Sequence, residues 1–230
     1  MSTKKNKNQD QELINVENAL SASEVFIEKY KNQILYVVGS VVLVVLAILA
    51  FKAWYIAPRE VEAEGKIAIC QEYFAKDSFQ LALKGDGTDE FLGFEKIAKE
   101  YGMTKTANLA LAYAGVCKYR LSQYEEAIAY LKKVDFDSPN LTPATVGLMG
   151  DCYVQLGDYK SALKYYEKAV KEKNDLTAPL YLKKAAFIYE KEGDFSKAIE
   201  YYTIIKDKYF KSMQASDIEK YIERAKALQQ

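Results

Sequence analysis

The residues of this chain that could carry out chemistry are a short acidic loop, three cysteines and nineteen tyrosines, and the chain contains no histidine. Histidine is the commonest general acid or base near neutral pH and the commonest metal ligand, so its absence disfavours both kinds of site. The loop 84–90 has three acids but lacks the D-x-[DN]-x-[DN]-G spacing of a calcium loop. We therefore predict no metal site and no cofactor.

The cysteines are predicted to be buried free thiols. Cys117 and Cys152 occupy equivalent places in two successive sequence repeats, described below, so their Cα atoms should lie beyond the roughly 7 Å limit for a disulfide. Cys70 completes the set, and without histidine none of the three has the usual base that activates a nucleophilic thiol. The sequence offers no catalytic residue, and an enzyme is not expected.

The charge balance disfavours nucleic acid as a partner. The chain has 32 basic and 32 acidic residues. Binding to a phosphate backbone needs a surplus of Lys and Arg on one face, because affinity comes largely from neutralising phosphates. No such surplus exists in this sequence.

An apolar segment near the beginning of the sequence is predicted to cross a membrane. Residues 34–51 include no charge, and 18 residues of helix span roughly 27 Å, which matches a bilayer core. Trp54 and Tyr55 follow the segment, where interfacial aromatic residues are common. We expect a polar tail at 1–21 and a helix at 22–56 whose anchor is 34–56. A buried globular helix is the alternative, and the flanking charges do not decide the orientation.

The second half of the sequence repeats itself. GDYKSALKYYEKA begins at Gly157 and GDFSKAIEYYTII begins 36 residues later at Gly193, while SQYEEAIAYLKKV at Ser122 is a weaker copy. Small, aromatic and turn residues fall where the tetratricopeptide pattern has them, and this pattern forms helix-turn-helix units that stack. The sequence thus resembles an all-α tetratricopeptide solenoid. We expect three units over 108–212, a capping helix at 213–230, and a diverged helical pair over 57–107, with helices at 61–83 and 91–101.

The tetratricopeptide resemblance also implies a groove. In that family the first helix of each unit lines a concave surface that accepts extended or helical peptides. The tyrosines could also be imagined as a ligand box, but their helical spacing favours packing. Lys183, Lys184 and Lys191 form a basic patch. Either this patch contacts a ligand or it only keeps an exposed face soluble. The residues carried over to the groove are Tyr113, Tyr119, Arg120, Leu148, Asp151, Gln155, Lys183, Lys184, Phe187 and Lys191.

The whole chain resembles the ancillary SecYEG translocon subunit family in the form found in Bacteroidota. The resemblance rests on the stretch ENALSASEVFIEKYK, the apolar anchor, the ALKGDGT loop, the KEYG turn and the repeats through YIERAKA. It implies a single-pass inner-membrane protein with a cytoplasmic N-terminus and periplasmic repeats. The implied partners are Sec translocon subunits, periplasmic chaperones or exported polypeptides. The alternative is a scaffold or assembly factor of another cell-envelope complex.

Overall fold

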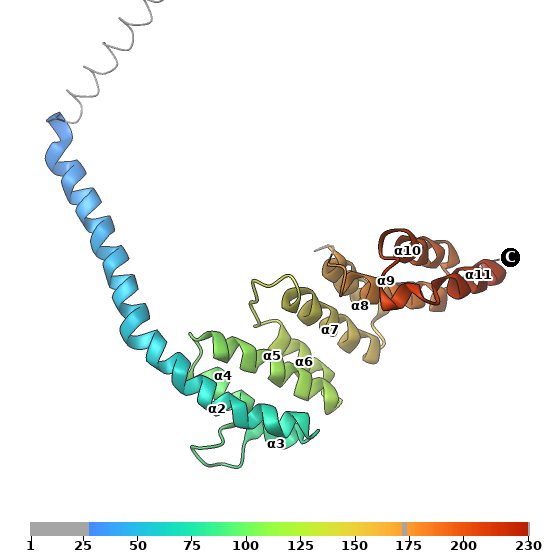
Figure 1. Ribbon diagram of the computed structural model, residues 1–230, viewed down its shortest axis with the longest axis horizontal. Coiled ribbons are helices and arrows are strands. Elements are labelled where there is room, and N and C mark those ends of the chain that lie inside the picture. Colours follow the sequence, from blue (N-terminus) through green and yellow to red (C-terminus); the bar gives the residue numbers. More distant parts are fainter. Residues whose placement is uncertain (1–27, 172–173, 230) are drawn as a thin grey trace, which may run out of the picture. The chain divides into compact units, whose positions relative to one another are not determined.

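The computed structural model describes residues 28–171 and 174–229, and these fall into two compact units, Met1–Ala57 and Pro58–Gln230. The predicted polar tail at 1–21 and the predicted start of the helix at residue 22 lie outside the described residues. All regular structure in the described ranges is helical (Figure 1). The all-α prediction is confirmed.

One helix of the described chain is long and apolar enough to cross a membrane. It runs over Glu28–Ala75, and its most apolar 18-residue window has a mean hydropathy of 3.0 and is 0% buried within the protein. Residues 28–51 are α-helical, and η1, Lys52–Ile56, is a π-helical turn. Trp54 lies in this turn with 85% of its surface exposed. A buried core helix would have its apolar side chains covered, so the globular alternative does not fit this helix.

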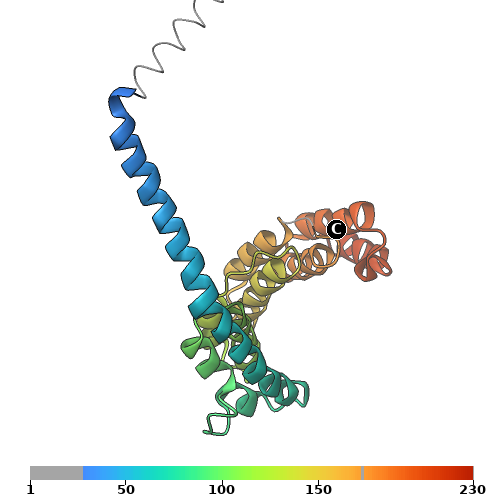
Figure 2. The same ribbon diagram turned by 60° about the vertical axis from the view of Figure 1, so that its left-hand side comes forward.

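The second unit is a row of helices in which α3 to α11 each pack against their neighbours in sequence, and it can be followed from green to red in Figures 1 and 2. Its elements are α2 (Ala57–Ala75), α3 (Phe79–Lys84), α4 (Gly93–Glu100), α5 (Lys105–Arg120), α6 (Tyr124–Leu131), α7 (Leu141–Gln155), α8 (Tyr159–Val170), α9 (Ala178–Lys191), α10 (Phe195–Lys208), η2 (Met213–Ala215) and α11 (Ile218–Gln229).

The Gly-Asp pairs of the repeat make the turns between paired helices. Gly157 and Gly193 have φ of 78° and 80°, a left-handed conformation that glycine adopts without a Cβ clash. Each following Asp caps the next helix, with Asp158 accepting a hydrogen bond from the Ser161 amide and Asp194 one from the Lys197 amide. The repeated dipeptide therefore ends one helix and starts its partner.

Ser122 occupies the same turn position in the first repeat and provides a stability test. Its φ is 60°, and the Gln123 amide donates to the Lys118 carbonyl at 2.8 Å, as in the other two turns. A left-handed conformation costs a non-glycine residue about 1 kcal/mol. We expect Ser122→Gly to raise the free energy of unfolding by up to about 1 kcal/mol in urea denaturation, less the added chain entropy. Gly157→Ser should lower it by a similar amount, and equal stability of all three proteins would contradict this account.

The region before the repeats has three helices rather than the expected pair. The expected helix at 61–83 is divided because Asp77, with φ of 55°, ends α2, and the Ser78 amide donates to the Tyr73 carbonyl at 3.0 Å. A short helix, α3, follows before the loop that leads to α4. The prediction of one continuous helix here was wrong because a non-glycine residue makes the left-handed turn, and no glycine signals it.

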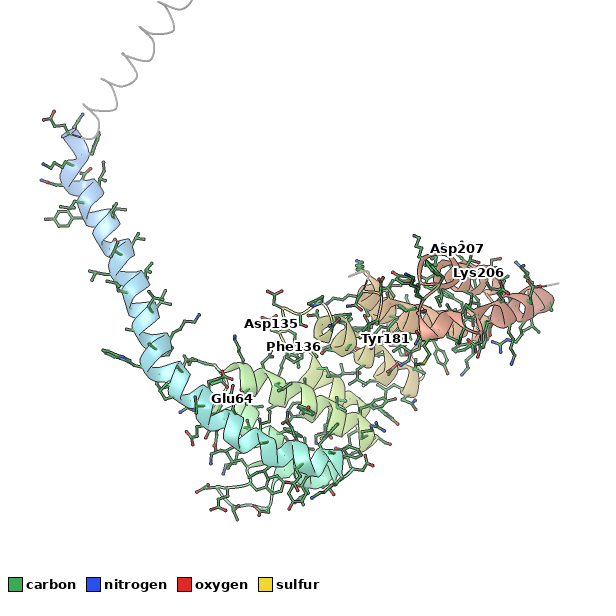
Figure 3. The ribbon with its side chains drawn as sticks, in the orientation of Figure 1. Glu64, Asp135, Phe136, Tyr181, Lys206 and Asp207 are labelled. Atoms are coloured by element: carbon green, nitrogen blue, oxygen red, sulfur yellow. The ribbon has the colours of Figure 1, made fainter. Side chains whose placement is uncertain are left out.

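Small residues permit the close crossing of helices in the second repeat. A Cβ at Gly150 would lie 2.5 Å from the Tyr166 ring, and a Cβ at Gly147 would lie 1.9 Å from the Tyr181 ring. The sequence predicts that Gly150 packs against Ala162 and Ala169; the structure places the Ala162 carbonyl oxygen 3.3 Å from that Cβ position and the Tyr166 ring nearer still. Tyr181, labelled in Figure 3, is buried and belongs to the next repeat, so Gly147 fits α7 against α9.

The N-terminal end of α5 is held by a side chain from α2. Glu60 accepts hydrogen bonds from the amides of Lys105 and Thr106 at 2.7 and 2.8 Å, and from the Thr106 hydroxyl at 2.6 Å. Thr104 is the N-cap of the same helix and accepts from the Ala107 amide. Glu60 and Thr104 thus satisfy three of the four amides that the first turn of a helix leaves unpaired.

The C-terminal helix α11 covers the last repeat. Ile218, Ile222 and Ala225 are buried in a cluster with residues of α9 and α10, while Lys220 and Glu223 are exposed. A stack of repeats needs such an end, because each unit leaves an apolar face uncovered.

Candidate binding groove

A hollow of about 370 Å³ lies where α5, α7 and α9, the first helices of the three repeats, come together with the start of α8. Its walls combine apolar side chains, tyrosine rings and a few charges. Phe187 is 39% exposed, which is unusual for a large aromatic residue. The lining residues are Tyr119, Asp151, Val154, Gln155, Tyr159, Tyr166, Lys184, Phe187, Ile188 and Lys191.

Six of the ten residues carried over from the sequence line this hollow. They come from all three first helices, so equivalent faces of successive repeats contribute to one concavity. The six are Tyr119, Asp151, Gln155, Lys184, Phe187 and Lys191.

The other four predicted residues lie elsewhere. Tyr113 stacks on Phe94 with ring centroids 4.8 Å apart, and Leu148 packs against the core of the second repeat. The Arg120 guanidinium lies over a phenylalanine ring of α3, at 5.7 Å from its centroid. Lys183 pairs with a carboxylate of the segment before α11.

Four lining residues, Val154, Tyr159, Tyr166 and Ile188, were not among the ten predicted ones. Tyr166 and Ile188 were missed because they read as packing positions, and both are indeed buried except where they reach the hollow. Tyr159 is the first residue of α8, and a rule restricted to first helices does not include it. Its position directly after the Asp158 cap is the sequence signal that could have identified it.

Asp151 is the centre of the polar contacts in the groove. The Lys184 ammonium donates to both of its carboxylate oxygens at 2.7 Å, and the Tyr166 hydroxyl donates to Oδ1 at 2.6 Å. Burial, together with the charge of Asp151, raises the pKa of Tyr166, so its hydroxyl stays protonated and remains a donor.

The basic patch expected from the sequence is largely neutralised by carboxylates. Lys184 pairs with Asp151, and Lys183 pairs with Asp217 at 2.7 Å. Of the three lysines, Lys191 alone has no ion pair with the residues that the structure describes; its ammonium contacts the Tyr159 hydroxyl and lies 4.4 Å from the centre of that ring. The groove therefore contains one cation available to an anionic group rather than three.

The potential catalytic groups have structural roles. Burial raises the pKa of Cys70 to about 11 and those of Cys117 and Cys152 to about 12, so the thiols are protonated at neutral pH. In the loop before α4, Asp86 accepts hydrogen bonds from the amide and the hydroxyl of Thr88. The described residues include no group of three or more acids, cysteines or histidines placed to hold a metal.

Comparisons with known proteins identify the repeats. Residues 94–169 match the profile of a family described as anaphase-promoting complex, cyclosome, subunit 3, and residues 183–212 match a tetratricopeptide repeat profile. The helical units within these two ranges have the tetratricopeptide-repeat fold. Tetratricopeptide repeats form a protein-interaction fold that is generally non-catalytic, so this part of the chain is a protein-binding module. No curated protein matches this chain.

One solved structure supports the tetratricopeptide fold. A structure from Podosopora anserina, assigned as a kinesin light chain with nearly identical TPR-like repeats, has a TM-score of 0.55 and 13% identity, over 73% of this chain and 86% of its own. The pilF protein of Pseudomonas aeruginosa has a TM-score of 0.41 and 17% identity, over 74% of this chain and 93% of its own. At 13% identity the likeness to the first of these structures is one of fold alone.

Proposed function

We propose that this protein is a membrane-anchored, non-catalytic accessory subunit of the Sec translocon that binds partner or client polypeptides in its tetratricopeptide groove. The observation that carries the proposal is the hollow shared by three first helices, which combines an exposed phenylalanine, apolar walls and tyrosine hydroxyls. Such a surface suits a peptide, since apolar contacts supply affinity and a few polar groups fix its register. The Sec assignment is supported by the resemblance of the chain's motifs to that subunit family.

The proposal also specifies the cellular location of the protein and its domain boundaries. We infer an inner-membrane location with a cytoplasmic N-terminus, an anchor ending at residue 56, periplasmic helices over 57–212 and a cap from 213. Because the native thiols are buried, one cysteine introduced at the exposed Lys220 can report the side of the membrane. A membrane-impermeant maleimide should label Lys220→Cys from the periplasmic side of sealed vesicles. Labelling only from the cytoplasmic side would reverse the orientation.

The groove is tested by photo-crosslinking in the native membrane. A crosslinking amino acid at Phe187 or Tyr119 should capture a translocon subunit, a periplasmic chaperone or an exported chain. The same amino acid at Lys220, on the exposed face of α11, is the control and should capture these partners at least several-fold less. Capture of a different envelope complex without the channel would favour the alternative scaffold role. Equal capture from the groove positions and from Lys220 would show that the groove is not the binding surface.

A further inference from the structure

The Lys184 ammonium occupies a site built from residues of α7, α8 and its own helix α9. Besides its two bonds to Asp151, it lies 5.5 Å from the ring centre of Tyr181 and 6.0 Å from that of Tyr166. A carboxylate beside aromatic faces is an arrangement that binds ammonium and guanidinium groups. Lys184 is thus the internal occupant of a cation site in the groove.

The walls of this site are fixed. The Tyr166 hydroxyl holds the Asp151 carboxylate, whose side chain is only 17% exposed. The rings of Tyr166 and Tyr181 stack with centroids 5.7 Å apart, and the Tyr181 hydroxyl donates to the Ala144 carbonyl. Three elements, α7, α8 and α9, therefore hold the carboxylate and the rings in place independently of the Lys184 ammonium.

The occupant is exchangeable. Lys184 ends a flexible four-carbon stem, and 34% of its side chain is exposed. The Lys184 ammonium donates no other hydrogen bond to the described residues. Water solvates the released ammonium well, whereas the Asp151 carboxylate, 17% exposed, keeps the hydrogen bond from Tyr166 and needs a replacement cation. A second cation can therefore compete for the site without unfolding the repeat.

The lining of the hollow favours a basic ligand over an acidic one at this point. Asp151 is the only carboxylate among the described lining residues, and burial together with the charge of Asp151 raises the pKa of the neighbouring Tyr119. A ligand carboxylate here would meet Asp151 as a like charge, whereas an arginine that displaced Lys184 would take its place beside the carboxylate and the buried rings of Tyr166 and Tyr181. Lys191, near Tyr159, is where an acidic ligand would bind instead.

We propose that Asp151, Tyr166 and Tyr181 form a cation subsite of the groove, that Lys184 occupies it in the free protein, and that a bound polypeptide places an arginine or lysine side chain there and displaces Lys184. This inference rests on the proposed peptide-binding function and specifies the chemistry of the ligand. It makes Lys184 an internal competitor that restricts binding to peptides carrying a suitable basic residue.

The subsite can be tested with a small probe and the full chain in detergent. N-acetyl-arginine amide is titrated and followed through the NMR signals of ring-labelled tyrosines, with N-acetyl-citrulline amide as the neutral isostere. We expect Lys184→Met to bind the arginine probe about tenfold more tightly than the wild type does, and to bind citrulline no better. Adding Asp151→Asn to Lys184→Met should abolish the gain. Lys191→Met is the matched control and should leave arginine affinity within about twofold.

Two results would overturn the subsite. One is failure of Lys184→Met to bind arginine in preference to citrulline while its thermal unfolding matches that of the wild type. The other is tighter binding of N-acetyl-glutamate amide than of the arginine probe, lost in Lys191→Met, which would assign the groove to acidic ligands. The proposed function is tested independently of the subsite, because partner crosslinks from Phe187 do not depend on the arginine probe. If Phe187 crosslinks to partners but the protein shows no preference for the arginine probe, only the subsite proposal is rejected.

Discussion

Gly150→Leu should lower the free energy of unfolding by about 3 kcal/mol, because the added side chain has no space. A Cβ alone would lie 2.5 Å from Tyr166 Cε1 and 3.3 Å from the Ala162 carbonyl oxygen. The Tyr166 ring cannot move aside freely, since its hydroxyl is bound to Asp151 and its face is stacked on Tyr181. The substitution therefore separates α7 from α8 or breaks the contacts of the ring.

The measurement is urea denaturation followed by circular dichroism, with Gly65→Leu as the matched control. Gly65 lies within α2, and a Cβ there would meet nothing within 4 Å. The control should keep or slightly raise the stability, because leucine is a better helix former than glycine. If the two substitutions changed stability equally, the assigned register of α7 on α8 would be wrong.

Glu60→Ala should lower the free energy of unfolding by about 2 kcal/mol through the start of α5. The substitution removes the acceptor of two amides and one hydroxyl, and these groups of Lys105 and Thr106 gain no replacement within the protein. It also removes a negative charge from the N-terminal end of a helix, where the helix dipole favours it. Glu64→Ala is the control, because Glu64 is exposed on the same helix, where Figure 3 labels it.

The contribution of Glu60 should depend on pH. Burial raises its pKa, but the hydrogen bonds from the Thr106 hydroxyl and from the amides of Lys105 and Thr106 outweigh burial and leave the pKa below its ordinary value. The stabilisation is therefore complete above the unfolded-state pKa of about 4.3 and is lost as the pH falls through the lower folded-state value. The stability difference between wild type and Glu60→Ala should shrink over that acidic range, and a constant difference would contradict the role of the ionised carboxylate.

The parts of the fold that the sequence predicts are those set by local chemistry. The Gly-Asp turns at Gly157 and Gly193 depend on one residue's backbone freedom and on the next residue's cap, and both can be read from two letters. The break at Asp77 could not be predicted in this way, because a non-glycine residue takes the left-handed conformation there. Contacts between units are harder still: nothing near Gly147 in the sequence indicates the Tyr181 ring that it accommodates.

The sequence placed six of its ten groove residues at the hollow but did not predict how their charges are paired. Counting places along each first helix puts Asp151, Lys184 and Lys191 on one face, where the structure also has them. Their electrostatic state depends on partners more than thirty residues away, as Asp151 depends on Lys184. A sequence shows which charges exist, whereas their neutralisation is a property of tertiary packing.

Trp54 and the tyrosines give this molecule two separate optical reporters. Trp54 is the only tryptophan in the chain and lies in the π-helical turn, with its indole exposed, whereas most of the nineteen tyrosines belong to the repeats. Indole emission shifts to shorter wavelength when the ring leaves water for the headgroup region of a bilayer. Excitation at the red edge of tyrosine absorption therefore follows the proposed anchor helix alone. Tyrosine emission from the same sample follows the repeats. Partitioning into lipid and melting of the solenoid can therefore be recorded side by side in the native sequence, without an attached dye.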